Sequence, residues 1–470
     1  MFIRIIIASF LFLLSVILIG QNLDKPFWGE HDWNGVRYGN IARNYLRYGI
    51  LETKLGQVEN SGIVGKGDFE YYTHYPPLLP LAIGLSYKIF GVSEWSTRIV
   101  PLLTTAGSIV LIFLIGTNYN LKIGIVAALL SLITPLSLYF GKNASHEPLA
   151  LFFILLSLYG YISLRRLRHA KLIFISGLVL AQLTAWAGFF LIPALALTHL
   201  LRREGDKFKE LIPYWILSVA LFGFHLLHIK LLTGSIAGGE LFESLLQRSG
   251  LAQDPQPAGF NLPNYLNQLR LWFSTLYTLT LTILATFWLV IRRFNIKGDE
   301  WPIFSLGLIG VIYIILFSNS VFIHNYLIFY FLPLLSLTGT RTIFLIKEKY
   351  DTLVYHTKFK KTYLRFISDF IILFFLALII FERRDFLTAL HISQQDKFTV
   401  EVGKAINRNS KPEDLILVSP LKYQYSADKF LRFYSDRKII YSDEEITNYN
   451  VWVKVYQNEG KFEIIRKDSK

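Results

Sequence analysis

Two short clusters of ionisable residues stand next to apolar segments and have the composition of a catalytic or cation-binding site. The clusters are Glu30-His31-Asp32 and His146-Glu147. Each joins an imidazole to a carboxylate, which suits a general base oriented by its neighbour or a site for a divalent cation. Ordinary helix starts explain the same residues, because Asp32 fits an N-cap and Glu147 before Pro148 fits an acidic first turn. Spacing alone leaves both interpretations open.

Two basic residues and one turn are further candidates for a binding site. His74 precedes paired prolines, and it either donates a hydrogen bond to a phosphate or is an ordinary interfacial residue, which composition favours. Arg98 opens an apolar run, where its guanidinium either snorkels to the membrane surface or clamps phosphate oxygens. His324 and Tyr326 lie at a turn between two apolar runs and could line a cavity.

Several well-known sources of catalytic power are absent from the sequence. The chain has no Cys, which excludes disulfides, thiolate metal sites and thiol nucleophiles. It also lacks a Walker loop, a Rossmann glycine fingerprint and the Gly-x-Ser-x-Gly and His-Glu-x-x-His motifs. An enzyme with this sequence therefore takes its energy from an activated substrate, and a membrane setting favours a lipid phosphate as the activated group.

The elements that must position these residues are membrane helices. Of the 470 residues, 53% are hydrophobic and 17% are charged, which is more apolar surface than one water-soluble core can hold. A formal net charge of +14 would suggest nucleic acid in a soluble protein, but here the location of the charge decides its meaning. We expect a polytopic α-helical membrane protein that does not bind nucleic acid.

About eleven apolar runs are predicted to cross the membrane, since a bilayer core of roughly 30 Å needs about 20 apolar residues. The runs lie near residues 3–20, 98–116, 123–139, 148–164, 211–232, 269–291, 302–317, 326–340 and 366–381, with two short helices within 172–201 that separate near 185–188. The run 78–90 is not counted, because about 13 residues at 1.5 Å each reach only roughly 20 Å.

Lysine and arginine gather in four loops, and their distribution predicts the orientation of the chain. The basic stretches lie at residues 165–171, 202–209, 292–297 and 341–365. Cytoplasmic loops of membrane proteins are enriched in these residues, so all four stretches are expected inside the cell. The N-terminus is then cytoplasmic, the protein crosses the plasma membrane many times, and the chain after residue 382 lies outside.

The chain is expected to form one membrane domain and one small soluble domain. Residues 1–382 are predicted to be the transmembrane domain, with residues 22–97 as a large first outer loop. Within this loop, residues 33–48 and 78–90 have apolar side chains at helical spacing and are expected to lie in the membrane interface. Residues 383–470 mix helical and strand patterns and end in a hairpin, which predicts an extracytoplasmic α/β domain.

Motifs around the candidate residues resemble a known family. The stretch from Glu30 to Gly49 resembles the first outer loop of the polytopic glycosyltransferases with the GT-C fold, which use lipid-phosphate sugars. This superfamily includes the protein O-mannosyltransferases and the lipid A aminoarabinose transferases. Further similar stretches are Thr73 to Pro80, Phe90 to Arg98, Thr134 to Leu149, and His324-Asn325-Tyr326 with Pro333. The resemblance is dense over about the first 200 residues and thinner after them.

The resemblance implies inverting transfer of a sugar from a polyprenyl- or dolichyl-phosphate donor to a hydroxyl of a glycan, lipid or protein acceptor. By its place in the motifs, Asp32 corresponds to the general base, with Glu30 as the less favoured choice. Glu147 corresponds to a second outer acid that is usually Asp in the family. His74 takes the place of a basic residue that contacts the lipid phosphate in some members, and Arg98 is either a phosphate contact or a structural anchor.

A divalent cation is a further implication, since some members of the family use a metal and others do not. Its predicted ligands are His31, Asp32, His146 and Glu147. No other cofactor is expected.

The main alternative is a flippase or transporter of lipid-linked glycans, which would also be polytopic and basic on the inside. A transporter predicts charged groups along a path through the spans. Here the acids cluster at one interface and the predicted spans hold few charges, which favours the enzyme. A third alternative, a membrane scaffold whose outer domain binds a partner, would not explain why the acid clusters are present.

Overall fold

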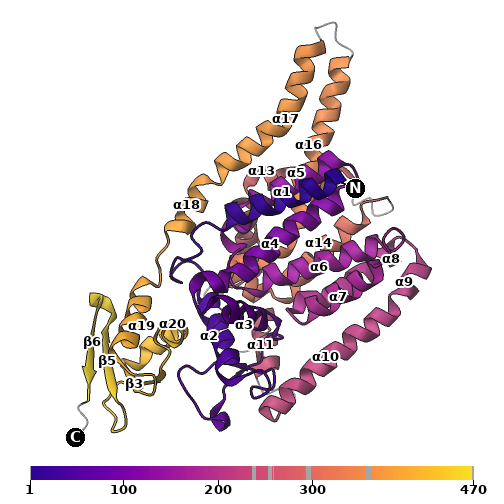
Figure 1. Cartoon of the computed structure of the whole chain (residues 1–470). Coiled ribbons are helices and arrows are strands. Elements are labelled where there is room, and N and C mark those ends of the chain that lie inside the picture. Colours follow the sequence, from indigo (N-terminus) through magenta and orange to yellow (C-terminus); the bar gives the residue numbers. More distant parts are fainter. Residues whose placement is uncertain are drawn as a thin grey trace. The chain divides into compact units, whose positions relative to one another are not determined.

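The computed structural model describes residues 2–235, 240–251, 257, 259–292, 298–355 and 361–467 (Figure 1). The chain forms two compact units. The first, called here the helical unit, consists of Met1–Gln21, Pro101–Lys142 and His146–Ala389. The second, called here the mixed unit, consists of Asn22–Val100, Asn143–Ser145 and Leu390–Lys470. The mixed unit is therefore assembled from segments that lie far apart in the sequence.

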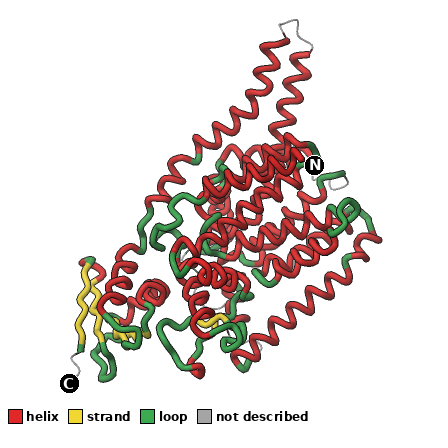
Figure 2. Tube along the Cα trace, viewed as in Figure 1, coloured by secondary structure: helices red, strands yellow, loops and turns green. Residues whose placement is uncertain are grey.

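Helices make up almost all of the helical unit, as Figure 2 shows. They are α1 (Phe2–Ile19), α4 (Glu94–Gly116, whose first turns belong to the mixed unit), α5 (Leu121–Leu132), α6 (His146–Ile162), α7 (Ala170–Gln182), α8 (Leu191–Leu201), α9 (Gly205–Glu210), α10 (Ile212–Thr233), α11 (Glu240–Ser249), α12 (Leu262–Leu276), α13 (Leu279–Arg292), α14 (Trp301–Leu316), α15 (Ser318–Ile323), α16 (Leu332–Tyr355), α17 (Lys361–Glu382) and α18 (Arg384–Ile392). Single turns of tighter or wider helix lie at Leu136–Phe140, Trp186–Phe190 and Asn325–Phe331.

Each apolar run that the sequence predicts as a span coincides with helical structure. Four helical segments are long and apolar enough on their own to cross a membrane, namely Phe2–Ile19, Glu94–Gly116, Gly205–Thr233 and Asn325–Leu353. Helices α5, α6, α7, α8 and α14 are shorter, and α12 and α13 meet at an angle of 112°. The bend falls at Thr278, whose φ of +71° cannot continue a right-handed helix. The number of eleven crossings stays a prediction.

The predicted division of residues 172–201 into two helices is confirmed. Helix α7 ends at Gln182, and a turn at Trp186–Phe190 leads into α8. On its other side α7 packs against α6 so closely that side chains on two glycines would collide with backbone (Figure 1). A Cβ at Gly160 would lie 2.5 Å from the backbone nitrogen of Phe174, and one at Gly177 would lie 2.6 Å from that of Ser157. Small residues at a crossing let membrane helices approach in this way.

The first part of the mixed unit contains the two helices that the sequence predicts in the first loop. These are α2 (Trp33–Tyr48) and α3 (Leu78–Phe90), and between them β1 (Gln57–Val58) pairs antiparallel with β2 (Tyr71–Tyr72). Two side-chain amides of α2 donate hydrogen bonds to the loop that connects α2 with α3. Asn40 donates to the carbonyl of Glu59 at 2.8 Å, and Asn44 donates to the carbonyl of Val58 at 2.9 Å. That α2 and α3 lie in a membrane interface stays a prediction.

The last part of the mixed unit is a four-stranded sheet with two helices against one face. Its elements are α19 (Lys397–Asn409), β3 (Leu415–Ser419), α20 (Gln424–Ser435), β4 (Lys438–Tyr441), β5 (Val451–Tyr456) and β6 (Lys461–Arg466). The strand order is β4-β3-β5-β6; β3 runs parallel to β4 and β5, and β5 and β6 form the predicted antiparallel hairpin. Buried side chains of α19, α20, β3 and β5 form the core of this part.

The two parts of the mixed unit share a second hydrophobic core. Phe27 and Val36 from the first loop pack with Val400, Phe430 and Phe433 from α19 and α20. Because these side chains are buried, neither part completes its apolar packing without the other.

Candidate functional site

Asp32 ends a tight turn at the start of α2. His31 has a φ of +58°, and the backbone N–H of Asp32 donates to the carbonyl of Gly29 at 3.2 Å. Asp32 takes the N-cap position, as the helix-start interpretation predicts, but its side chain makes no capping hydrogen bond to α2. Its Oδ2 instead accepts from the backbone N–H of Gly29 at 2.8 Å. The carboxylate is therefore turned back onto the preceding loop.

Arg98, in the first turns of α4, fixes the other side of this carboxylate. Its Nη2 lies 3.2 Å and 3.3 Å from the two oxygens of Asp32. Its Nη1 donates to the backbone carbonyls of Leu23 and Lys25, and its guanidinium lies 4.3 Å from the centre of the Phe27 ring. Arg98 is only 4% exposed. These contacts make it an anchor for residues 23–32, and phosphate binding by Arg98 stays a prediction.

The contacts of Asp32 leave room for one more hydrogen-bond donor. A carboxylate has about four lone-pair sites, and the bonds from Gly29 and Arg98 use three of them. The Asp32 side chain is 12% exposed, so it is reachable although most of it is covered. A rigid carboxylate with a remaining lone pair can accept a proton from an approaching hydroxyl.

Two further ionisable residues that the sequence did not single out lie near this turn. Burial, and then the charge of Asp32, raises the pKa of Asp396 to about 6. The backbone N–H of Asp396 donates to the carbonyl of Trp28 at 3.2 Å. Burial lowers the pKa of Lys25, whose Nζ donates to the carbonyl of His391 at 2.5 Å. Asp396 precedes α19 as an ordinary N-cap candidate, so no pattern in the sequence connects it with Asp32.

The rest of the first cluster surrounds the same turn. His31 Nε2 lies 3.8 Å from a carboxylate oxygen of Glu30, and Trp33 Nε1 donates to His31 Nδ1 at 3.4 Å. The backbone carbonyl of His31 accepts from Asn143 Nδ2 at 3.2 Å. A carboxylate oxygen of Glu30 therefore lies near the His31 ring, whereas the carboxylate of Asp32 is paired with Arg98.

His74 also belongs to the mixed unit and follows β2. It is half-buried, and its ring centre lies 4.8 Å from that of Tyr72. Tyr72 in turn lies under the guanidinium of Arg37, at 4.8 Å. His74 thus lies among aromatic and cationic side chains, and its binding of a donor phosphate stays a prediction.

The second cluster opens α6 in the helical unit. His146 and Glu147 are both buried, and Glu147 is in the first turn, as the helix-start interpretation predicts. Arg248, at the end of α11, is close enough to interact electrostatically with His146. No motif in the sequence marks Arg248, which falls in a long predicted loop.

The predicted cavity-lining pair also lies in the helical unit. The rings of His324 and Tyr326 are 5.8 Å apart, and Tyr326 packs against Phe140 at 5.9 Å. Phe140 stands shortly before His146 in the chain, in one of the stretches that carry the family resemblance.

The residues that the structure describes do not form a complete set of ligands for a metal ion. No group of three or more His, Asp or Glu side chains is arranged to hold an ion there. The four predicted ligands divide evenly, since His31 and Asp32 belong to the mixed unit and His146 and Glu147 to the helical unit. Neither unit alone offers more than one imidazole and one carboxylate of this set.

Comparison with known proteins identifies relatives in fold. Residues 74–228 match the family model of the dolichyl-phosphate-mannose-protein mannosyltransferases. The crystal structure of ArnT from Cupriavidus metallidurans bound to undecaprenyl phosphate matches with a TM-score of 0.60 and 13% identity, over 93% of this chain and 85% of that one. The apo oligosaccharyltransferase of Archaeoglobus fulgidus matches with a TM-score of 0.58 and 13% identity, over 93% of this chain and 64% of that one. Among curated proteins, none matches the chain in sequence.

Proposed function

We propose that this chain, a polytopic helical membrane protein with the GT-C fold, is a glycosyltransferase that moves a sugar from a polyprenyl- or dolichyl-phosphate donor to an acceptor hydroxyl. The family model matched by residues 74–228 supports a lipid-phosphate sugar as the donor. ArnT, which has the same fold, binds undecaprenyl phosphate. The acceptor is a glycan, a lipid or a protein, and the reaction takes place on the extracytoplasmic side of the plasma membrane.

The observation that carries the proposal is the geometry of Asp32. Its carboxylate is held by the backbone of Gly29 and by Arg98, and it keeps a lone pair for one more donor. A catalytic base must be held in one orientation to be effective, because small displacements of a reacting group are costly. Asp32 meets this requirement, and it stands in the motif where the family resemblance expects the base.

The proposed reaction is a single displacement at the anomeric carbon. The acceptor hydroxyl donates a hydrogen bond to Asp32, which takes the proton as the oxygen attacks. The bond from the anomeric carbon to the phosphate oxygen breaks as the new glycosidic bond forms. The polyprenyl phosphate leaves with the electron pair of the broken bond, and Asp32 later releases its proton to solvent. The configuration of the sugar inverts.

Other side chains would stabilise the charge of the departing phosphate or hold the reacting groups in position. The departing phosphate needs cationic or hydrogen-bonding partners, and we propose His74 for this role. Arg98 acts through Asp32, because its guanidinium is already engaged by that carboxylate and by backbone carbonyls. Glu147 is proposed as the second acid, which orients the acceptor.

The test is transfer by the purified full-length protein supplied with a panel of radiolabelled polyprenyl-phosphate sugars. Asp32→Asn keeps the size of the side chain and removes the base, so we expect transfer to fall by about 10²-fold or more while the donor still binds. Asp24→Asn is the matched control, since Asp24 is exposed in the same loop. Unchanged transfer by Asp32→Asn would remove Asp32 from the mechanism. Movement of a lipid-linked glycan across the membrane without any transfer would favour the flippase.

A further inference from the structure

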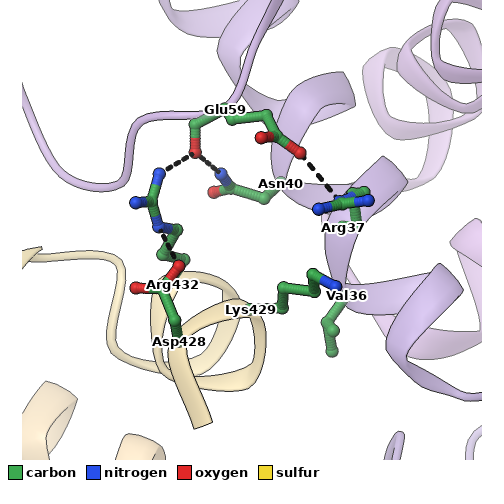
Figure 3. Close-up of a pocket in the computed structure, with 7 residues that line it drawn as sticks. All are labelled: Val36, Arg37, Asn40, Glu59, Asp428, Lys429 and Arg432. Atoms are coloured by element: carbon green, nitrogen blue, oxygen red, sulfur yellow. Dashed lines mark hydrogen bonds and ion pairs between the residues drawn. The ribbon is translucent and has the colours of Figure 1, made fainter. Parts of the chain in front are cut away.

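A small polar cavity lies within the mixed unit, between α2 and α20 (Figure 3). Its volume is about 60 Å³. One wall is formed by Arg37, Asn40 and Glu59 and the other by Asp428, Lys429 and Arg432. No residue proposed for sugar transfer lines it, so a ligand bound here would be independent of the proposed function.

The two carboxylates in the wall are each matched by an arginine. Arg37 Nε lies 2.8 Å from Glu59, and Arg432 Nε lies 2.7 Å from Asp428. Arg432 also donates from Nη1 to the backbone carbonyl of Glu59 at 3.1 Å and to Glu70 at 3.0 Å. Figure 3 shows the contacts of Arg37 and Arg432 with Glu59 and Asp428. The acids in the cavity are therefore already engaged.

Lys429 is the cation in the wall that forms no close ion pair in the described part of the chain, although the charges of Glu59 and Asp428 still act on it. In the described part of the chain its ammonium makes no hydrogen bond or ion pair, and it lies 4.6 Å from the centre of the Trp33 ring. Three cations and two carboxylates line this cavity, and the third carboxylate nearby, that of Glu70, binds Arg432 rather than Lys429. Burial, followed by the charge of Arg37, lowers the pKa of Lys429 to about 8. An anion bound next to Lys429 would offset the cost of keeping its ammonium charged away from water.

The size of the cavity limits the ligand. Because one water molecule needs about 10–15 Å³ by this measure, the cavity holds roughly four water molecules. That space admits a carboxylate, sulfate or phosphate group but not a sugar ring or a nucleotide. Guanidinium and ammonium groups are the usual partners of such oxyanions. We propose that this cavity is a binding site for a single oxyanion group, either a free ion or the charged group of a larger molecule, with Lys429 as its main contact.

Competitive acylation of lysines on the purified full-length protein tests this site without any mutation. The protein is labelled at pH 8 in phosphate, in sulfate, in acetate, in glucose 1-phosphate, and in sodium chloride of matched ionic strength, which controls for screening. Mass spectrometry then compares Lys429 with Lys422, an exposed lysine close to it in the chain. If an oxyanion raises the pKa of Lys429 by one unit, its neutral fraction falls by about fivefold, so we expect labelling to fall by about that factor at Lys429 only.

The outcomes separate the sources of the ligand. Protection by phosphate, sulfate or acetate but not by glucose 1-phosphate supports a site for a free ion. Protection by glucose 1-phosphate as well supports a site for a charged group on a larger molecule. Equal labelling of Lys429 in every oxyanion and in chloride overturns the proposal. In a second measurement, phosphate should raise the unfolding midpoint of the wild type and of Lys422→Met but not of Lys429→Met; a phosphate-induced rise in Lys429→Met as large as that of the wild type also overturns it.

Discussion

Arg98 Nη2 lies 3.2 Å and 3.3 Å from the two carboxylate oxygens of Asp32, a residue 66 positions earlier in the chain. The same guanidinium holds two backbone carbonyls of the loop that leads to Asp32. One cation therefore determines both the path of the loop and the orientation of the proposed base. This pairing makes the role of Arg98 testable separately from that of Asp32.

Replacing Arg98 should impair catalysis through the position of Asp32. In Arg98→Gln the carboxylate loses its ion pair and the loop loses its anchor, so we expect transfer to fall by roughly 10²-fold, with the loss mainly in kcat. Arg98→Lys keeps the charge but not the fork of donors, and it should recover only part of the activity. The matched control is Arg384→Gln, because the Arg384 side chain is 77% exposed. Full activity in Arg98→Gln would contradict the positioning role.

Asp396 should make stability depend on pH. Its folded-state pKa of about 6 lies above the ordinary value of 3.8, so the folded state favours the neutral acid. Well below the ordinary value of 3.8 the residue is protonated in both states and has no effect on stability. As pH rises toward 6 and above, ionisation costs stability, by about 1 kcal/mol once its partial exposure is taken into account. Asp396→Asn should therefore be more stable than wild type at pH 7, by a difference that shrinks as the pH falls toward 4.

The measurement is the thermal unfolding midpoint of both proteins between pH 4 and pH 8. Asp385→Asn serves as the control, because the Asp385 side chain is fully exposed and its removal should leave the pH profile unchanged. Parallel profiles for wild type and Asp396→Asn would contradict the prediction.

The ion pair between Arg47 and Asp436 should stabilise the attachment of α20 to α2. Arg47 Nη2 lies 2.7 Å and 2.6 Å from the two oxygens of Asp436, and Arg43 lies 3.2 Å from the same carboxylate. Asp436 has a φ of +52°, a conformation that Asn tolerates, so Asp436→Asn removes the charge without straining the backbone. We expect a loss of about 1–3 kcal/mol in the free energy of unfolding.

Denaturant unfolding and limited proteolysis of the C-terminal part both measure this effect. Arg408→Gln is the control, since Arg408 is exposed on α19. A double-mutant cycle with Arg47→Gln should show coupling between the two residues. If the losses in unfolding free energy of the two single variants add up to that of the double variant, the ion pair itself does not contribute to stability.

The crossing of α6 and α7 should not tolerate a side chain at Gly160. A Cβ there would lie 2.5 Å from the backbone nitrogen of Phe174, so Gly160→Ala forces the helices apart and should cost about 1–3 kcal/mol. Gly223 in α10 has no atom within 4 Å of its Cβ position, so Gly223→Ala should be neutral or slightly stabilising. Unfolding midpoints of the two variants in the same detergent give the comparison. Equal midpoints would refute close packing at this crossing.

Local patterns were a good guide to the elements of this protein. The run Leu78–Phe90 is a helix with the predicted bounds, because Pro77 precedes it and Gly91, with a φ of +77°, ends it. The break between α7 and α8 and the hairpin of β5 and β6 also follow from residues that are near one another in the chain. Each of these features depends on side chains within a few positions.

Contacts between distant segments could not be predicted in the same way. Arg98 fits membrane snorkelling as well as it fits a bond to Asp32, and only the packing of the loop decides between them. Asp396 and Lys429 have ordinary neighbours in sequence, and their shifted pKa values arise from burial in the folded unit. The strand order β4-β3-β5-β6 likewise depends on how the chain crosses over between strands.

The shared core of Phe27, Val36, Val400, Phe430 and Phe433 has a consequence for how the protein is made. Some 300 residues separate Val100 from Val400, and at roughly 5–20 residues per second a ribosome needs about 15–60 s to synthesise them. During that time the loop that bears Asp32 has no partner for its apolar side chains. The proposed base therefore reaches its final surroundings only when α19 and α20 emerge, so a nascent chain that stalls earlier would be inserted in the membrane but inactive.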